Sequence, residues 1–489
     1  MEAFSELKTP AFVFDFPAIR QQLTTMANKD KNATEADIHT RSLYRGNSGD
    51  SPLVWVGRDG VDHRADTLLA WLHRVDEIGL SEQSFGVAAM ESDLKRMRTL
   101  DFDEQDNTIN QVAARLEYRL TKACLRYVFG QRFGFINPHR TFNALDRAQS
   151  DTVNHVYKYR GMFDVEMDLP TKAYTDKVIA KLRSDSLSAL LREVQPHDKI
   201  YEQLKAMLSK ADSAQERRRI LCNMERRRWR VHQPIKENEK RIVVNIPAFE
   251  LYAYAADSVM PMRVVCGAIG THTPQLSSYI EYMEVNPRWN IPYSIIKKDV
   301  AHRAGDSSYF TRNRYQIFDS SGKVVPAGSV SSQMLLSGRY HVSQVGGAGN
   351  ALGRIVFRFK NKFSVYLHDT SNPSAFQRSV RALSHGCVRV SKPFELAEFL
   401  LATSDTWLLD RIRLAMGKPA ATEQGREYVK NHGTDACKSL VSRVSLDARV
   451  PLYIIYYTIW PDETGTLRTW PDIYNHDQVI WRQLQPYMQ

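Results

Sequence analysis

The 489-residue chain has few cysteines and no long hydrophobic run. Its five cysteines are dispersed, odd in number and never spaced as Cys-x-x-Cys. This pattern argues against a disulfide framework, and we expect neither a metal site nor a cofactor. No stretch of about 18 apolar residues occurs, so we expect no membrane-spanning helix. The opening MEAFSELKTPAFVFDF has no basic head followed by an apolar core, so no export signal is visible.

The composition is otherwise that of an ordinary folded protein. Hydrophobic residues make up 43% and charged residues 25% of the chain, which excludes a disordered or collagen-like protein. Lys and Arg number 66 against 55 Asp and Glu, a net charge of +11. A basic protein can bind polyanions, but the basic residues mostly alternate with acidic ones, so we expect no nucleic-acid partner. The length predicts roughly two to four domains.

Residues 1–236 predict a helical domain. Apolar residues recur at helical spacing in the segments 64–80, 112–128, 176–191, 199–208 and 214–231. The last of these contains QERRRILCNMERRRWRV and is strongly basic. A run of charge on a helix is usually solvated, so we expect these side chains to face solvent.

Residues 237–489 predict a mostly β domain, so the fold class is α+β. Short β-branched or alternating runs, separated by Pro and Gly, occur at 241–246, 250–255, 263–268, 278–285 and 354–359. Residues 300–349 lack strong periodicity and contain several aromatic residues, which is typical of either a lid or a decorated surface loop. Residues 450–480 predict a C-terminal hairpin region.

One segment carries a distinctive set of reactive residues. Cys387 directly follows Gly386, and His368 precedes the cysteine by 19 positions at the end of a predicted strand. A free thiol, with a pKa of about 8.5, is only a few per cent ionised at neutral pH. A neighbouring imidazole can take its proton and form a thiolate–imidazolium pair. A tight turn before the cysteine also leaves backbone N–H groups that can face a developing oxyanion.

This arrangement resembles the signature of YkuD-type L,D-transpeptidases, in which a His is followed after a gap by Ser/Thr-His-Gly-Cys, a hydrophobic residue and a polar one. Here fifteen residues separate His368 from the run Ser384-His385-Gly386-Cys387-Val388-Arg389. Many family members have Asn at the last of these positions, whereas Arg is found in the large, YcbB-like subgroup. That subgroup places a helical scaffold before the catalytic domain and a capping subdomain within it. Further segments resembling it are 244–248, 286–292, 350–354, 366–370 and 471–475.

The resemblance implies a role for each matching residue. Cys387 would be the nucleophile and His368 the general base, oriented by the backbone carbonyl of Asp369. The N–H groups of Gly386 and Cys387 would stabilise the oxyanion. The residues expected to contact substrate are Ser384, His385, Arg389, Arg354, Asn350 and Tyr366. For the two arginines, which can bind carboxylates in a bidentate manner, a structural ion pair is the alternative. For His385 the alternative is a structural role.

The resemblance also implies a reaction and a location. Cys387 would attack the meso-diaminopimelate carbonyl of a peptidoglycan tetrapeptide stem, release D-Ala and pass the acyl group to an amine of a second stem. Water, a free D-amino acid or a lipoprotein Lys are the other possible acceptors. Carbapenems would be covalent inhibitors, the 300–349 insertion a lid, and the periplasm or cell envelope the place of action. The alternatives are an L,D-carboxypeptidase, another cysteine peptidase or hydrolase, and a non-catalytic wall scaffold.

Overall fold

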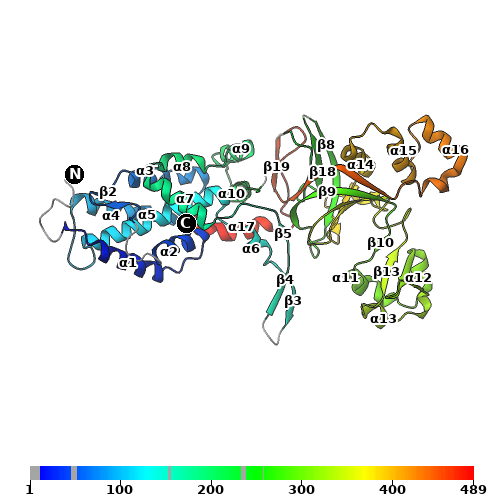
Figure 1. Cartoon of the computed structure of the whole chain (residues 1–489), viewed down its shortest axis with the longest axis horizontal. Helices are drawn as coiled ribbons and strands as arrows, with labels where there is room; N and C mark the ends of the chain where they lie inside the picture. The colour runs from blue at the N-terminus through cyan, green and yellow to red at the C-terminus, as the bar shows by residue number, and fades with distance from the viewer. Residues whose placement is uncertain (1–11, 46–51, 152–155, 233–237, 257, 489) are drawn as a thin grey trace. The chain divides into compact units, whose positions relative to one another are not determined.

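The computed structural model describes residues 12–45, 52–151, 156–232, 238–256 and 258–488, and the chain divides into two compact units (Figure 1). Unit 1 consists of Met1–Thr141, Glu166–Pro234 and Asn475–Gln489, and unit 2 of Phe142–Val165 and Ile235–Tyr474. A helical N-terminal region followed by a mostly β region confirms the α+β class. The boundary expected at residues 236–237 lies outside the described residues. The C-terminal segment, expected with the β domain, packs within unit 1.

Where the structure describes it, unit 1 is mostly helical, with a two-residue β-ladder between β1 (Val56–Gly57) and β2 (Gly60–Val61) and an isolated bridge between Met167 and Val231. Its helices are α1 (Phe16–Lys29), α2 (Glu35–Arg45), α3 (Arg64–Leu72), α4 (Val87–Thr99), α5 (Ile109–Phe133), α7 (Lys172–Arg183), α8 (Leu187–Glu193), α9 (Lys199–Leu208), α10 (Ala214–Arg228) and α17 (His476–Leu484), with α6 (Pro138–Phe142) at the boundary with unit 2. Helix α9 has the bounds that its apolar spacing predicts. The expected helix 176–191 is divided, because Asp185 between α7 and α8 has a left-handed φ of 55°.

The charges in the second half of α10 are buried, so the prediction of a solvated basic face is wrong there, whereas Glu216 and Arg217 in the first half are exposed as expected. Arg226 and Arg228 each retain 1% exposure. Arg226 forms an ion pair with Asp477 of α17 at 2.6 Å, and Arg228 pairs with Glu225 at 3.3 Å. Burying a charge is tolerated when it is paired. Both arginines are paired inside unit 1, and Arg228 also donates hydrogen bonds to Gln131 and Tyr201.

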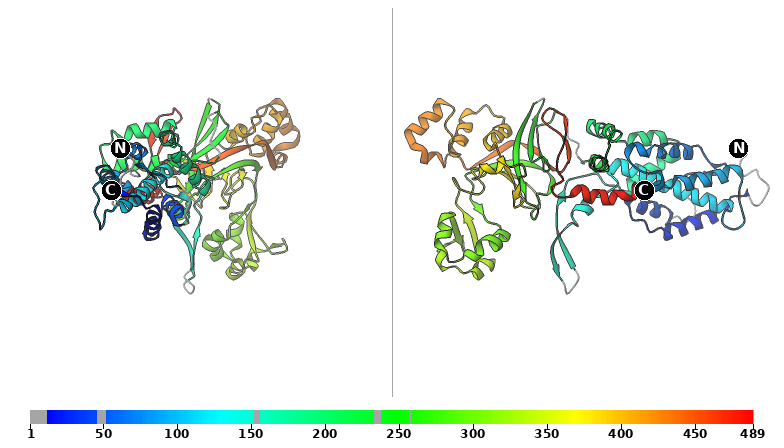
Figure 2. Two further views of the ribbon diagram at one scale, coloured as in Figure 1. Left: turned by 60° about the vertical axis from the view of Figure 1, so that its left-hand side comes forward. Right: turned by 180° about the vertical axis from the view of Figure 1, so that it is seen from behind.

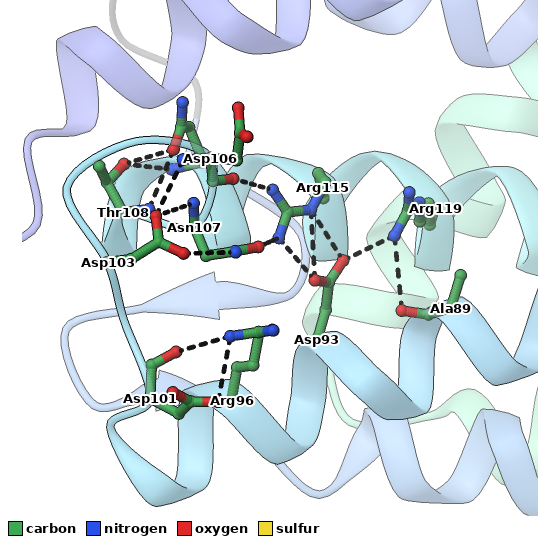
Figure 3. A network of polar contacts seen from close by, with 11 residues as sticks. Ala89, Asp93, Arg96, Asp101, Asp103, Asp106, Asn107, Thr108, Arg115 and Arg119 are labelled. Carbon is green, nitrogen blue, oxygen red and sulfur yellow. Dashed lines mark hydrogen bonds and ion pairs between the residues drawn. The ribbon is translucent and has the colours of Figure 1, made fainter.

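A second ionic network joins α4 to α5 (Figure 3). The carboxylate of Asp93 accepts hydrogen bonds from Arg115 at 2.7 Å and from Arg119 at 2.7 Å. The Arg115 guanidinium also donates to the carbonyl oxygen of Asp106 and to the side chain of Asn107 in the loop before α5. These contacts hold that loop against the two helices.

Unit 2 is built on a sheet that closes on itself. Its strands are β5 (Phe163–Asp164), β6 (Arg241–Asn245), β7 (Glu250–Ala255), β8 (Ser258–Gly267), β9 (Gln275–Val285), β14 (Ile355–Phe359), β15 (Leu367–His368), β16 (Ala382–Ser384), β17 (Val388–Val390) and β18 (Arg443–Ile455). Their order is β14-β15-β17-β8-β7-β6-β18-β9-β5, with β16 beside β8, and a β14–β9 pairing completes the ring. Closure satisfies backbone groups that an open sheet would leave at its edges.

Three helices and two hairpins complete unit 2 apart from its inserted subdomain. Helices α14 (Pro393–Leu401), α15 (Thr406–Ala415) and α16 (Glu423–Cys437) lie together beside the sheet (Figure 2). The hairpins are β3 (Asp146–Asp151) with β4 (Val156–Arg160), and β19 (Ile459–Pro461) with β20 (Leu467–Thr469). The second hairpin turns at Asp462–Gly465, within the predicted 450–480 region, whereas residues 450–455 belong to β18 of the closed sheet.

The insertion is an ordered subdomain with its own sheet and core. Its strands are β10 (Trp289–Asn290), β11 (Tyr315–Phe318), β12 (Val324–Val325) and β13 (His341–Gln344), and its helices are α11 (Tyr293–Ile295), α12 (Ser307–Arg312) and α13 (Ser332–Leu336). Ile291, Phe310, Leu335 and Val342 are buried in a cluster separate from the core of the closed sheet. The subdomain therefore begins near Trp289, earlier than the irregular segment 300–349 expected from the sequence. Across the described residues of the whole chain, none of the helices has both the length and the apolar character needed to span a bilayer.

Candidate active site

The parallel pairing of β15 with β17 brings the predicted nucleophile and base together. Leu367 lies opposite Val388, and His368 lies opposite Arg389. Leu367 and Val388 are buried in the core of the sheet. Successive side chains of an extended strand point to opposite faces. Tyr366 and His368 beside Leu367, and Cys387 and Arg389 beside Val388, therefore point away from that core.

Contacts among the four flanking residues agree with this common face. The rings of Tyr366 and His368 lie 5.7 Å apart in an edge-to-face arrangement. The Tyr366 hydroxyl lies close enough to the Cys387 thiol to favour its ionised form, and the charge of Arg389 acts on both Cys387 and His368. Two short strands thus gather a thiol, an imidazole, a phenol and a guanidinium, although among the described residues no hydrogen bond joins Cys387 Sγ to the imidazole.

Burial favours the neutral form of both reactive groups. His368 is 4% exposed, and burial together with the nearby Arg389 charge lowers its pKa to about 3. Burial raises the pKa of the Cys387 thiol above its ordinary value, with the Tyr366 hydroxyl and the Arg358 and Arg389 charges opposing that rise. These directions favour a neutral thiol beside a neutral imidazole over the thiolate–imidazolium pair expected from the sequence.

The turn before Cys387 is held by its own side chains. Ser384 Oγ accepts a hydrogen bond from the Gly386 N–H at 3.1 Å and donates to the Cys387 carbonyl at 2.5 Å. Gly386 has a φ of 120°, a conformation that favours glycine, and an added Cβ would meet only ordinary contacts from 3.6 Å outward. Ser384 is therefore used within the turn, and the Gly386 N–H is not free for an oxyanion. Among the described residues, the Cys387 N–H has no hydrogen-bond partner.

The two predicted arginines occupy different environments. No carboxylate among the described residues lies within ion-pair distance of Arg389, and its buried Nε has no hydrogen-bond partner there. Arg354 instead donates to the Asn286 side chain at 3.2 Å. Arg358, which the sequence did not single out, lies over the Tyr366 ring at 4.7 Å and pairs with Glu284 at 2.8 Å. Arg389 is thus the guanidinium that remains available beside the thiol.

Two further predicted residues serve the local backbone. The Asn350 side chain donates to the carbonyl oxygens of Pro287 and Val345 and accepts from the Leu352 N–H. It therefore connects the segment that enters the capping subdomain with the segment that leaves it. The Asp369 carboxylate accepts from the Arg354 N–H at 2.8 Å. The backbone carbonyl of Asp369 lies close enough to His368 to favour its protonated form slightly, although Nδ1 makes no hydrogen bond of ordinary geometry.

The capping subdomain contacts this face at two points. His385 lies 3.8 Å from the carboxylate of Asp299, which belongs to the short helical turn Ile296–Val300 of the subdomain. The Trp289 side chain of β10 is hydrogen-bonded to the Tyr366 side chain. The half-exposed His385 thus faces the cap rather than the thiol.

Two family models match this chain over long, separate ranges. Residues 239–437 match the model of the L,D-transpeptidase catalytic domain, and residues 39–208 match that of a scaffold domain. The chain carries a YkuD-type L,D-transpeptidase domain. It is also 32% identical over 257 residues to a Haemophilus influenzae protein named "Putative L,D-transpeptidase". That match covers 51% of this chain and 48% of the relative, so the chain spans about half the length of the curated relative.

A scaffold domain before an L,D-transpeptidase catalytic domain is the YcbB-like architecture expected from the sequence. The sequence did not identify the residues of this catalytic domain that hold the cysteine turn from outside. The Thr271 hydroxyl donates to the Ser384 carbonyl, and the Thr273 hydroxyl to the Gly386 carbonyl, both at 2.8 Å. The Tyr474 hydroxyl donates to the Gly267 carbonyl where this threonine loop leaves β8. The local signal for Thr273, a Thr-Pro pair before a strand, is too common to have found it.

Proposed function

We propose that this protein crosslinks peptidoglycan as a cysteine-dependent L,D-transpeptidase. The observation that carries the proposal is the β15–β17 register, which directs Cys387 and His368 to one face with an unpaired Arg389 beside them. The match of residues 239–437 to the catalytic-domain model supports the reaction class. The substrate would be a stem peptide in the cell envelope.

The proposed reaction is a two-step acyl transfer. In the first step the Cys387 sulfur bonds to the meso-diaminopimelate carbonyl carbon of a tetrapeptide, its proton passes to His368, and the C–N bond to the terminal D-Ala breaks. His368 returns the proton to the departing amine. In the second step an amine of another stem attacks the thioester, forms an amide and regenerates the thiol. The Cys387 N–H is the donor we assign to the oxyanion of both steps.

If Cys387 and His368 are both neutral before substrate binds, substrate binding can activate His368 as a base. The Arg389 charge is one cause of the low pKa of His368. A substrate carboxylate bound to Arg389 would offset that charge and make the imidazole a stronger base. Deprotonation of the thiol would then accompany substrate binding. The cap contacts at Asp299 and Trp289 support a lid that keeps water from the thioester.

Incubation of the protein with purified disaccharide tetrapeptide tests the proposed function. We expect mass spectrometry to detect release of D-Ala, a thioester on Cys387 and a dimer joined between two diaminopimelate residues. Trimmed monomers without dimers would identify an L,D-carboxypeptidase instead. Absence of both D-Ala release and a Cys387 adduct would contradict the proposed function.

Replacing Arg389 with Met should weaken use of the donor stem by about 10- to 100-fold in kcat/KM, mainly through KM, because a charge-assisted carboxylate contact is lost. A stem whose diaminopimelate carboxylate is amidated provides the decisive comparison. The native protein should prefer the free acid, and Arg389→Met should discriminate little between the two stems. Steady-state D-Ala release with both stems measures this.

Arg449→Met is the matched control for that variant. Arg449 lies on β18, and its side chain is 66% exposed beside Glu281. This control should keep the preference for the free acid. If Arg389→Met lowers kcat/KM equally for the acid and the amide, Arg389 does not bind the carboxylate.

A further inference from the structure

We infer that Thr273 is a positioning residue that orients the oxyanion-binding N–H of Cys387. The inference rests on the proposed acyl transfer and concerns a residue that contacts neither the thiol nor the imidazole in the hydrogen-bond network of the described residues. Thr273 lies in the loop between β8 and β9, 113 positions before Gly386 in the sequence, and is fully buried. Its hydroxyl is the link between that loop and the catalytic turn.

The Thr273 hydroxyl bridges two backbone groups. Oγ1 accepts from the Gly267 N–H at 2.8 Å and donates to the Gly386 carbonyl at 2.8 Å. Accepting from an N–H commits one lone pair and leaves the single hydroxyl proton to point at the carbonyl. The Gly386 carbonyl has no other hydrogen-bond partner among the described residues.

Peptide geometry converts that contact into control of the Cys387 N–H. The Gly386 carbonyl and the Cys387 N–H belong to one peptide group, which is planar and trans, so they point in opposite directions. Holding the oxygen at Thr273 therefore turns the N–H away from the loop. The N–H of Cys387 remains unpartnered among the described residues, whereas that of Gly386 is committed to Ser384 Oγ. Gly386 has a φ of 120° and lacks a side chain, so this peptide needs an external restraint to keep its orientation.

The threonine loop is built to approach the turn closely. A Cβ at Gly267 would come within 2.0 Å of the Thr271 carbonyl oxygen and 2.7 Å of the Thr273 nitrogen, so glycine is required for the loop to fold back on β8. Tyr474 braces the same point, because its hydroxyl donates to the Gly267 carbonyl and accepts from the Thr273 N–H. The hydroxyl of Thr273 is thus presented by a fixed loop.

The test compares Thr273→Val with Thr273→Ser in two reactions of the same thiol. Valine keeps the shape but removes the hydroxyl, and serine restores it. Thioester formation from disaccharide tetrapeptide, followed by intact mass, needs an oxyanion donor, whereas alkylation of Cys387 by iodoacetamide does not. We expect Thr273→Val to slow thioester formation about 10- to 100-fold through kcat with KM little changed, and to leave alkylation within about twofold. Thr273→Ser should recover most of the native acylation rate.

Thr271→Val is the matched control, since the Ser384 carbonyl that Thr271 holds also accepts from the Ala268 N–H at 2.8 Å. It should slow acylation by no more than about threefold. Native acylation by Thr273→Val, an equal loss of acylation and alkylation in it, or no rescue by serine would each overturn the role of Thr273. Failure of the native protein itself to acylate would instead overturn the proposed function.

Discussion

Replacing Cys387 with Ser is expected to abolish thioester formation and crosslinking together, a loss of at least about a thousandfold. A serine hydroxyl is much harder to deprotonate than a thiol, and the imidazole of His368 on β15, which pairs with β17, has its pKa lowered to about 3 by burial and by Arg389. Such a base cannot compensate for the change of nucleophile. Intact mass should detect no adduct after incubation with the tetrapeptide or with a carbapenem.

Cys437→Ser provides the control for this variant. Cys437 is a buried free thiol at the end of α16, and its Sγ donates to the Gly433 carbonyl, a bond that a hydroxyl can also make. It should retain native activity and remain acylated at Cys387. Full acylation of Cys387→Ser, or an adduct on a different cysteine of the native protein, would remove Cys387 from the nucleophile's role.

Periodicity predicted those parts of the fold in which local sequence decides the structure. Helix α9 and strand β7 have the bounds read from their apolar spacing. The helix buries Tyr201, Leu204 and Leu208 on one face, and the strand buries the consecutive residues Leu251, Tyr252 and Ala253. The charges of α10 were misread, because the partner of Arg226 is Asp477, 251 positions along the chain (477 − 226). A window of sequence around α10 contains no sign of that partner. The helix is polar in composition, and the charges of its second half are buried with partners.

The helices and strands of the capping subdomain could not be predicted from periodicity, for a different reason. Its strands have two to four residues and its helices three to six, so no segment completes enough turns or alternations to show a period. Its core forms only when Ile291 and Val342, from opposite ends of the insertion, meet. Aromatic content predicted that the segment matters, but the boundary at Trp289 required the structure.

The motif in the sequence indicates the reactive residues of the candidate site, but it does not indicate the side chains that hydrogen-bond to the backbone around them. His368 and Cys387 stand out because their spacing is specific. Asn350 and Ser384 also match the family pattern. Their polar atoms, however, form hydrogen bonds to the backbone where the capping subdomain joins the sheet and within the cysteine turn. Thr273 carries no reactive group and lies far from the motif in sequence. A search of the sequence for nucleophiles and bases does not find residues that orient a backbone N–H.

The buried His368 is expected to make the native protein acid-labile in a defined pH range. Its pKa is lowered from 6.5 to about 3 in the folded protein. Below about pH 6.5 the unfolded chain binds a proton at this position and the folded protein does not, so the free energy of unfolding falls as the pH falls. The loss continues down to about pH 3 and totals about 5 kcal/mol, since the pKa is lowered by about 3.5 units and one unit corresponds to about 1.4 kcal/mol. Above pH 6.5 both states are neutral here and the contribution is constant.

His368→Gln removes the titrating group and should remove this part of the pH dependence, while abolishing acyl transfer. Urea denaturation at about pH 7, 5.5 and 4 measures it through the unfolding midpoint of the catalytic unit. The native curve should fall relative to the variant by about 1.4 kcal/mol per pH unit between about pH 5.5 and 4. His302→Gln, at an exposed position of the cap, is the control for loss of a histidine. Parallel curves for native protein and His368→Gln would mean that the imidazole is protonated in the folded state, and a preformed thiolate–imidazolium pair would then replace the neutral pair proposed for the resting enzyme.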